Sequence, residues 1–256
     1  MTDPGLVSHS GGLIWHFRAW RRHAGLWADF CHRIDRFLID WQHELHQHYT
    51  APGRLPGVIL LGPSGGWCLP RRGFLEQFAS VVMVDSDPLA KKIFYRRHHV
   101  HARTDQEWVW IASIFERVLP ALLARHPHHA VLFCNVLGQL RYRDDQPLER
   151  IEFELNQLKV LLAGRHWASF HDRISGDARH GQATASEFSA SGPVQPADLA
   201  KRVATKGEWL DHLTENVLPP QSGRRLMCWP ISQRRLHWVE AGWANGNEAA
   251  KARWPH

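Results

Sequence analysis

Two short stretches of the sequence combine a turn of small residues with a carboxylate. Residues 58–66 read V-I-L-L-G-P-S-G-G, an apolar run followed by a glycine turn, and residues 81–85 read V-V-M-V-D. Glycines after a buried strand let the backbone approach a ligand closely. An acid at the end of the next strand can accept hydrogen bonds from the two hydroxyls of a ribose. Gly62 and Asp85 are separated by close to the ~20 residues typical of such a unit, so the pair predicts a site for a ribose-containing cofactor.

A second set of polar residues follows later apolar runs. Asn135 comes directly after the run 130–134, and His171 and Asp172 come directly after residues 166–170. In a doubly wound sheet the carboxyl ends of the strands border the ligand cleft. We therefore interpret His171 as a candidate general base with Asp172 as a neighbouring acid. The alternative is a structural histidine, because adjacent residues of an extended chain point in opposite directions and Asp172 need not orient His171.

The elements that must position these residues alternate between strands and helices, which predicts a parallel sheet covered by helices. Strands are expected over residues 58–62, 81–85, 99–103, 130–134 and 166–170. Helices are expected over residues 71–79, 88–97, 106–125, 147–163 and 197–218. In the second of these helices Asp87 is the favoured cap, and Asp105 is a candidate cap for the third.

The end of the chain breaks this alternation. Residues 173–196 are rich in Gly, Ser, Ala and Pro and are expected to form a loop. Residues 225–243 predict two strands joined by a short connection, and Pro230 argues against an unbroken central strand there. The predicted class is α/β, a doubly wound and mostly parallel sheet with an antiparallel C-terminal strand pair.

The N-terminal part differs from the rest of the chain. Apolar residues recur over positions 13–45 at spacings of three and four, which predicts helix, with Gly25 as a candidate break. The turn-rich segment 50–57 follows. We therefore predict an N-terminal helical cap over residues 1–50 and one α/β domain over residues 51–256. The cap either packs on the domain or forms a lid over a substrate pocket.

Composition sets further bounds. The 256 residues are 44% hydrophobic and carry a net charge of +6, typical of a globular protein that tolerates an acidic partner without requiring one. No apolar run reaches the ~18–20 residues of a membrane span, and the first residues lack the features of a secretory signal, so a cytoplasmic location is expected. The four cysteines are far apart, and the histidine clusters at 98–101 and 126–129 lack a carboxylate or thiol to complete a site. No metal is therefore expected.

The chain resembles the class I S-adenosylmethionine-dependent methyltransferases, which have a Rossmann-like, seven-stranded fold, over roughly residues 55–243. Residues 62–66 stand in the place of their glycine-rich first motif, and Asp85 matches the acid that binds the cofactor ribose. Asp105 is placed like their adenine-side polar residue, and residues 132–138 match their fourth motif. The chain departs from the family in two ways: no acid precedes the first glycine, and the fourth motif lacks the N-P-P-Y/F form.

The resemblance implies a function and a set of cofactor-binding residues. The function is methyl transfer from S-adenosylmethionine to an acceptor, for which the cap and the 13 Trp favour a small molecule. A nucleic acid or a protein remains open as substrate, as does the oligomeric state. The alternative is a methyltransferase-like fold that acts as a non-catalytic binding or scaffold protein. The cofactor-binding residues that the resemblance implies are Gly62, Pro63, Ser64, Gly65, Gly66, Asp85, Ser86, Asp105 and Asn135.

Overall fold

A computed structural model of the chain describes residues 11–49, 54–98, 106–110, 118–142, 147–178, 183, 185–203 and 208–246, and the side chains of all of these except 106–110. The chain divides into two compact units, Met1–Cys134 and Asn135–His256. We describe each unit by itself. The boundary expected near residue 50, between a cap and a domain, stays a prediction.

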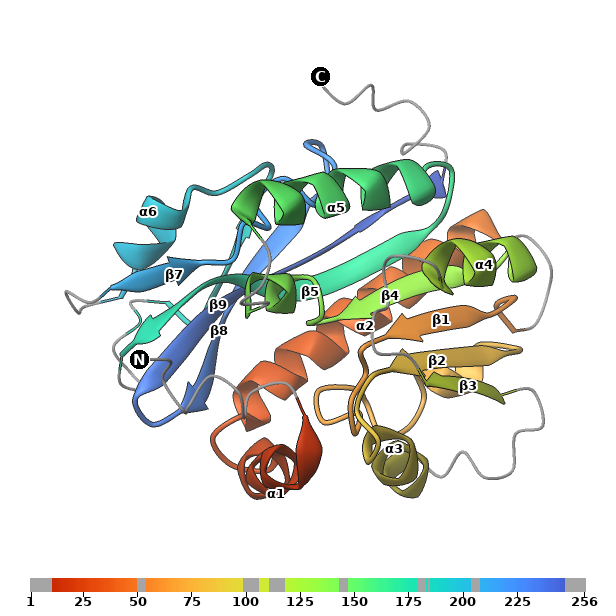
Figure 1. The fold of residues 1–256 in the computed structure, drawn as a ribbon, viewed down its shortest axis with the longest axis horizontal. Helices are drawn as coiled ribbons and strands as arrows, with labels where there is room; N and C mark the ends of the chain where they lie inside the picture. Colours follow the sequence, from red (N-terminus) through yellow and green to blue (C-terminus); the bar gives the residue numbers. More distant parts are fainter. Residues whose placement is uncertain are drawn as a thin grey trace. The chain divides into compact units, whose positions relative to one another are not determined.

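The first unit contains a parallel sheet in the order β3-β2-β1-β4 (Figure 1). β1 is central, and Val58 is paired with Val81 on one side and with Ala130 on the other. Every residue of β1, β2 and β4 is buried, as expected of apolar runs covered on both faces. The elements of this unit are α1 (Gly12–His23), α2 (Ala28–His48), β1 (Val58–Leu61), η1 (Leu75–Gln77), β2 (Val81–Asp85), α3 (Ala90–His98), β3 (Gln106–Trp110), α4 (Val118–Arg125) and β4 (Ala130–Cys134).

The N-terminal helical pattern forms two helices separated by a turn that contains Gly25, as predicted. The apolar stripe of α2 is buried, and Gln42 donates a hydrogen bond from Nε2 to the carbonyl oxygen of Phe74 at 2.8 Å. The stripe of α1 is not buried: Leu13 is 74% exposed and Trp20 is 59% exposed. The face of α1 that contacts the unit instead carries His16 and Ala19.

Two helix predictions for the first unit are wrong in part: α4 forms the end of the helix expected over 106–125, but its beginning is a strand. Residues 106–110 form β3, which pairs in parallel with β2 from Gln106 to Trp110. The Q-E-W-V-W sequence is rich in aromatic and β-branched residues, which favour strands. Pairing with β2 therefore decides the conformation, although the apolar spacing also suits a helix. Residues 71–79 contain only the short η1. The strand expected over 99–103 and the residue Asp105 lie outside the described residues.

The second unit is antiparallel, in the order β5-β9-β8-β6 with β7 also paired to β5. Figure 1 shows β8 and β9 as a long hairpin. Its apolar core includes Ile174, Leu199, Leu226 and Trp238. The elements are η3 (Gly138–Tyr142), α5 (Leu148–Leu161), β5 (Trp167–Asp177), β6 (Glu187–Ala190), α6 (Pro196–Ala200), β7 (Trp209–Asp211), β8 (Arg224–Ser232) and β9 (Arg235–Ala244).

Three predictions for the second unit are wrong. His171 and Asp172 lie inside β5 and do not follow it. β5 continues to Asp177 and β6 follows, so residues 173–196 are not a loop. Residues 197–218 are not one helix, because α6 ends at Ala200 and β7 supplies a strand. β8 runs through Pro230 with an irregular register between Pro230 and Ser232, beyond the part paired with β6. Proline is tolerated there because no β6 partner needs its missing N–H.

The class α/β, with parallel strands and an antiparallel C-terminal strand pair, is confirmed. In the described part of the chain, no helix combines the length and the hydrophobicity that a membrane span requires.

Candidate functional site

The carboxylate of Asp85 joins the ends of β1 and β2. Its Oδ2 accepts a hydrogen bond from the backbone N–H of Ser64 at 2.6 Å, and its Oδ1 accepts one from the N–H of Asp87 at 2.8 Å. The glycine turn is tight: Gly62, Ser64 and Gly66 have φ values of 65°, 51° and 67°. The predicted acid and the predicted turn therefore lie together in the first unit.

The environment of Asp85 changes its acidity. Burial raises the pKa of Asp85 to about 6, and the charge of Asp87 acts in the same direction. Backbone hydrogen bonds from Asp87, Ser64 and Ser86 oppose this shift. Of the other predicted cofactor-binding residues, Pro63 in the glycine turn is buried and Ser86, directly after β2, is exposed. Asp85 is thus a nearly buried carboxylate held by backbone N–H groups.

Helix α1 contacts the same turn through polar groups. The N–H of Gly12 donates to Oδ2 of Asp87 at 2.9 Å, and Nε2 of His16 lies 2.8 Å from the same oxygen. The indole of Trp67 donates to Nδ1 of His16 at 3.0 Å, so Nε2 carries the proton that meets Asp87. The indole of Trp15 donates to Oγ of Ser64 at 3.3 Å.

Asp87 acts at the start of α3, as predicted. Its Oδ1 accepts a hydrogen bond from the N–H of Leu89 at 2.9 Å, and its carbonyl oxygen accepts one from Ala90 at 3.1 Å. Its Oδ2 meets His16 of α1. Asp87 therefore links α1 to α3, while Asp85 links the two strand ends.

The chain's own side chains fill the space beside two of the glycines. A Cβ on Gly65 would lie 2.6 Å from Nε1 of Trp67, and one on Gly66 would lie 2.1 Å from Nε2 of His98. The same nitrogen of His98 lies 3.3 Å from the carbonyl oxygen of Gly66. Packing inside the unit therefore already favours glycine at both positions. Their contact with a cofactor stays a prediction.

Burial of His98 leads to a test by pH. Burial lowers the pKa of His98 to about 4, and the charge of Arg97 acts in the same direction. The neutral ring is favoured in the folded state, so stability is lost as pH falls from about 6.5 towards 4. We expect His98 to contribute about 2 kcal/mol less to stability at pH 5 than at pH 7.

The matched variant is His98→Gln, whose side chain carries no charge at either pH. Urea unfolding of both proteins at pH 5 and pH 7 measures the difference, which cancels the opposite contribution of Asp85. Equal pH dependence in the two proteins would show that His98 is not held neutral.

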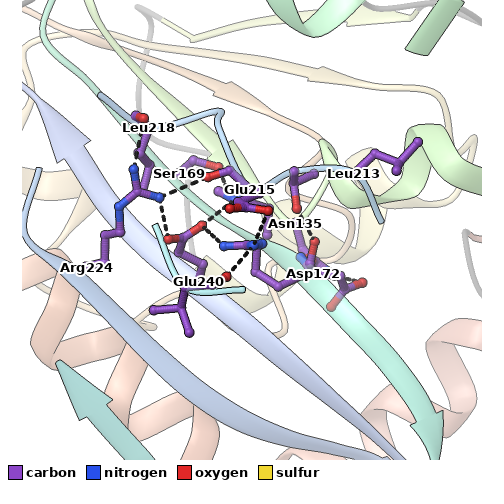
Figure 2. A network of polar contacts seen from close by, with 12 residues as sticks. Asn135, Ser169, Asp172, Leu213, Glu215, Leu218, Arg224 and Glu240 are labelled. Atoms are coloured by element: carbon purple, nitrogen blue, oxygen red, sulfur yellow. Dashed lines mark hydrogen bonds and ion pairs between the residues drawn. The ribbon is translucent and has the colours of Figure 1, made fainter. Parts of the chain in front are cut away.

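In the second unit the structure brings together Asn135 and Asp172. Nδ2 of Asn135 donates to Oδ2 of Asp172 at 3.2 Å, and its Oδ1 accepts the N–H of Asp172 at 2.9 Å (Figure 2). Asn135 has a φ of 55°, a left-handed conformation that Asn adopts more readily than most residues. Asn135, which follows β4, and Asp172, which lies inside β5, therefore bond to each other.

The side chains of His171 and Asp172 have different partners. His171 is fully buried, with Nδ1 2.8 Å from Oγ of Ser169 and Nε2 3.4 Å from Oε2 of Glu240. Glu240 also accepts bonds from Arg224 at 2.7 Å and from Arg173 at 3.0 Å, in the network drawn in Figure 2. Burial alone would raise the pKa of Glu240, but the nearby His171 and the charges of Arg173 and Arg224 lower it to about 2.

Asp172 instead meets two histidines that the sequence reasoning missed. Nδ1 of His237 lies 2.9 Å from its Oδ1, and His212 completes a group whose ligand atoms all lie within 4.8 Å of one another. Burial alone would raise the pKa of Asp172, but the charge and proximity of His237 lower it overall. Burial lowers the pKa of His212 to about 4. No local sequence motif joins these residues, because the pairing of β5 with β9 brings them together.

Comparison with known proteins adds solved structures only, since no family model and no curated protein matches the chain. The magnesium protoporphyrin IX methyltransferase ChlM from Synechocystis PCC 6803 with bound SAH is 13% identical, with 94% of this chain and 99% of that chain covered and a TM-score of 0.48. The structure of the same enzyme with bound SAM is 15% identical, with 89% of this chain and 90% of that chain covered and a TM-score of 0.44. The N-methyltransferase NodS from Bradyrhizobium japonicum WM9 with bound SAH is 12% identical, with coverages of 81% and 88% and a TM-score of 0.38.

These solved structures are S-adenosylmethionine-dependent methyltransferases, the class that the sequence resembles, and they hold the cofactor or S-adenosylhomocysteine.

Proposed function

We propose that the protein transfers a methyl group from S-adenosylmethionine and that the cofactor binds at the glycine turn of the first unit. The observation that carries the proposal is the bond from Ser64 N–H to Asp85 at 2.6 Å. It places a carboxylate at the end of β2 against the glycine turn at the end of β1, in which three residues have positive φ. This is the arrangement that receives a ribose in dinucleotide folds.

The residues present fit this cofactor in part. A carboxylate has about four acceptor sites, so Asp85 can bind ribose hydroxyls while it accepts Ser64 and Asp87. The departure is the filled space beside Gly65 and Gly66. We propose that Ser64, Asp85 and exposed Ser86 hold the ribose side. Helix α1 is then a lid, because Trp15 bonds to Ser64 of the turn and His16 lies against Asp87 after β2.

The cofactor supplies the methyl carbon when bound, and the protein must orient the acceptor and, for some acceptors, remove a proton. His171 and Asp172 stay the predicted catalytic residues. Both are buried: His171 lies against Ser169 and Glu240, and Asp172 lies against Asn135 and His237. A small-molecule acceptor and a cytoplasmic location are part of the proposal, with a nucleic acid or protein as the other substrate classes.

A second candidate function is a scaffold that binds no cofactor. The side chains beside Gly65 and Gly66, together with the absence of an acid before Gly62, favour it. The two functions differ in whether the turn binds the cofactor, and one binding measurement separates them.

The test is calorimetric titration of the protein with S-adenosylhomocysteine. We expect micromolar binding that weakens roughly 100-fold in Asp85→Ala, since hydrogen bonds to a charged group contribute about 1.5–3 kcal/mol each. Asp85→Asn, which keeps the shape of the side chain, guards against loss of folding. Glu76→Ala removes an exposed carboxylate of the same unit and should bind like the wild type.

Absence of binding to the wild type would contradict the methyltransferase proposal and favour the scaffold. Equal binding to all variants would place the cofactor away from Asp85.

A further inference from the structure

The second unit contains a compact group of three potential metal ligands. Asp172 comes from β5, His212 directly follows β7, and His237 comes from β9. The three residues are 2%, 0% and 7% exposed, and their ligand atoms lie within 4.8 Å of one another. We propose that Asp172, His212 and His237 bind a divalent transition-metal ion.

The hydrogen bonds of His212 select the nitrogen that would bind the ion. Its Nδ1 lies 2.8 Å from the carbonyl oxygen of Gly138, which can only accept, so Nδ1 carries the proton. Nε2 therefore presents a lone pair. A backbone carbonyl on the other ring nitrogen is the usual partner of a metal-binding histidine, because it fixes the tautomer and the ring orientation.

Asp172 is oriented in a comparable way. Asn135 donates to its Oδ2 at 3.2 Å and accepts its backbone N–H at 2.9 Å, which leaves Oδ1 towards the histidines. Outer contacts of this kind hold a metal-binding carboxylate in place. Both Asp172 and His212 therefore have the second contact that a preformed site requires.

Two atoms of the group lack the hydrogen bond that their burial demands. Oδ1 of Asp172 and Nδ1 of His237 are buried and lie 2.9 Å apart, yet neither makes a hydrogen bond within the described part of the chain. Their separation suits an ion pair, but their directions do not suit a hydrogen bond. Buried polar atoms are normally satisfied, and a cation that accepts a lone pair from each would satisfy both.

The donor set indicates the class of ion. Two imidazoles and one carboxylate suit zinc and divalent iron or cobalt, whereas magnesium and calcium prefer oxygen ligands alone. Three protein ligands leave a position for water or for an oxygen of a substrate, as in catalytic rather than structural sites. This inference does not depend on methyl transfer.

Two neighbouring residues weaken binding of the ion. Oγ of Ser175 lies 3.0 Å from Nε2 of His212, so a bound ion must replace this hydroxyl at the lone pair. Arg235 donates to the same Oγ at 3.1 Å and adds positive charge. We therefore expect Arg235→Gln to bind the ion more tightly than the wild type.

The proposal differs from the expectation of no metal, which considered histidines that are close in sequence. One of those, His129, lies 2.5 Å from Oγ of Ser80. In the described part of the chain, the group of Asp172, His212 and His237 is the one that brings a carboxylate together with two histidines at ligand spacing.

The test uses the full chain, stripped of metal by a chelator and titrated with Zn²⁺ by calorimetry and with Co²⁺ by visible absorption. We expect one ion per chain. Asp172→Asn and His237→Ala should weaken binding by at least roughly 100-fold, and Asn135→Ala by roughly 10–100-fold, as for outer contacts. His128→Ala, which removes an exposed histidine, should bind like the wild type.

X-ray absorption of the zinc-loaded wild type provides a measurement that needs no variant. Two imidazole nitrogens and a carboxylate oxygen around zinc would support the proposal. No binding to the wild type, a different set of ligands, equal binding by the Asp172 and His237 variants, or loss of binding in His128→Ala would overturn it. S-adenosylhomocysteine binding is measured separately, so failure here is distinguishable from failure of the proposed methyl transfer.

Discussion

Replacing Glu240 by Gln should destabilise the second unit by about 3–5 kcal/mol, the cost of removing one partner from a buried ion pair. Glu240 is fully buried and binds Arg224 at 2.7 Å and Arg173 at 3.0 Å, with both arginine side chains also buried. Gln keeps the shape of the side chain but removes the charge that compensates two guanidinium groups. Glu215 lies 4.0 Å from Arg173 and is partly exposed, so it compensates only in part. Urea unfolding at neutral pH measures the loss.

The matched control is Glu149→Gln, which removes one negative charge from an exposed position on α5 and should change stability little. A second readout comes from pH. Because the pKa of Glu240 is lowered to about 2, its contribution is present above the unfolded value of about 4.5 and is lost as pH falls towards 2. The Gln variant should lack this part of the acid dependence. A loss below about 1 kcal/mol would contradict the buried network.

The parallel strands could be predicted from sequence because consecutive apolar residues indicate their burial. β1, β2 and β4 are continuous apolar runs, and such runs are buried on both faces wherever the sheet places them. The break of the N-terminal pattern at Gly25 was predicted on equally local grounds. Strand β3 could not be predicted, because its sequence suits a helix as well as a strand. Pairing with β2 decides between the two conformations.

The second half of β5 shows where local pattern fails. Arg173 and Ser175 are buried polar residues inside a strand, so the segment lacks the apolar alternation that identifies one. Arg173 can be buried there because it pairs with Glu240, which lies far along the chain on β9. A buried charge requires its partner, and the partner becomes visible only when the strands are paired.

The candidate sites divide in the same way. Gly62, Asp85 and Asn135 could be selected because strand ends are predictable from apolar runs, whereas Asp172 was selected although it lies inside β5. Within each unit the structure brings them together pairwise: the turn after Gly62 bonds to Asp85, and Asn135 bonds to Asp172. His212 and His237 could not be selected. His212 belongs to a segment predicted to be helical, and His237 reaches Asp172 only through the register of β5 on β9.

Replacing Gly66 by Ala should destabilise the first unit by about 2–5 kcal/mol. The φ of 67° costs an L-residue about 1–2 kcal/mol. The new Cβ would lie 2.1 Å from Nε2 of His98 and 3.1 Å from Cδ2 of Phe94, and such overpacking costs about 1–3 kcal/mol more. Gly73→Ala is the control: its φ is 86°, and a Cβ there would meet no atom within 4 Å, so only the backbone cost of about 1–2 kcal/mol applies.

A double variant separates the two roles of Gly66. His98→Ala removes the ring that a Cβ would meet, so Gly66→Ala should cost less in that background than in the wild type, a coupling that a double-mutant cycle measures. Titration of the double variant with S-adenosylhomocysteine then measures the effect of the added methyl group on cofactor binding alone. If Gly66 is glycine only for the sake of His98, the double variant should bind like His98→Ala alone. If the backbone of the turn must also approach the cofactor, the added methyl group should abolish binding even where folding is restored.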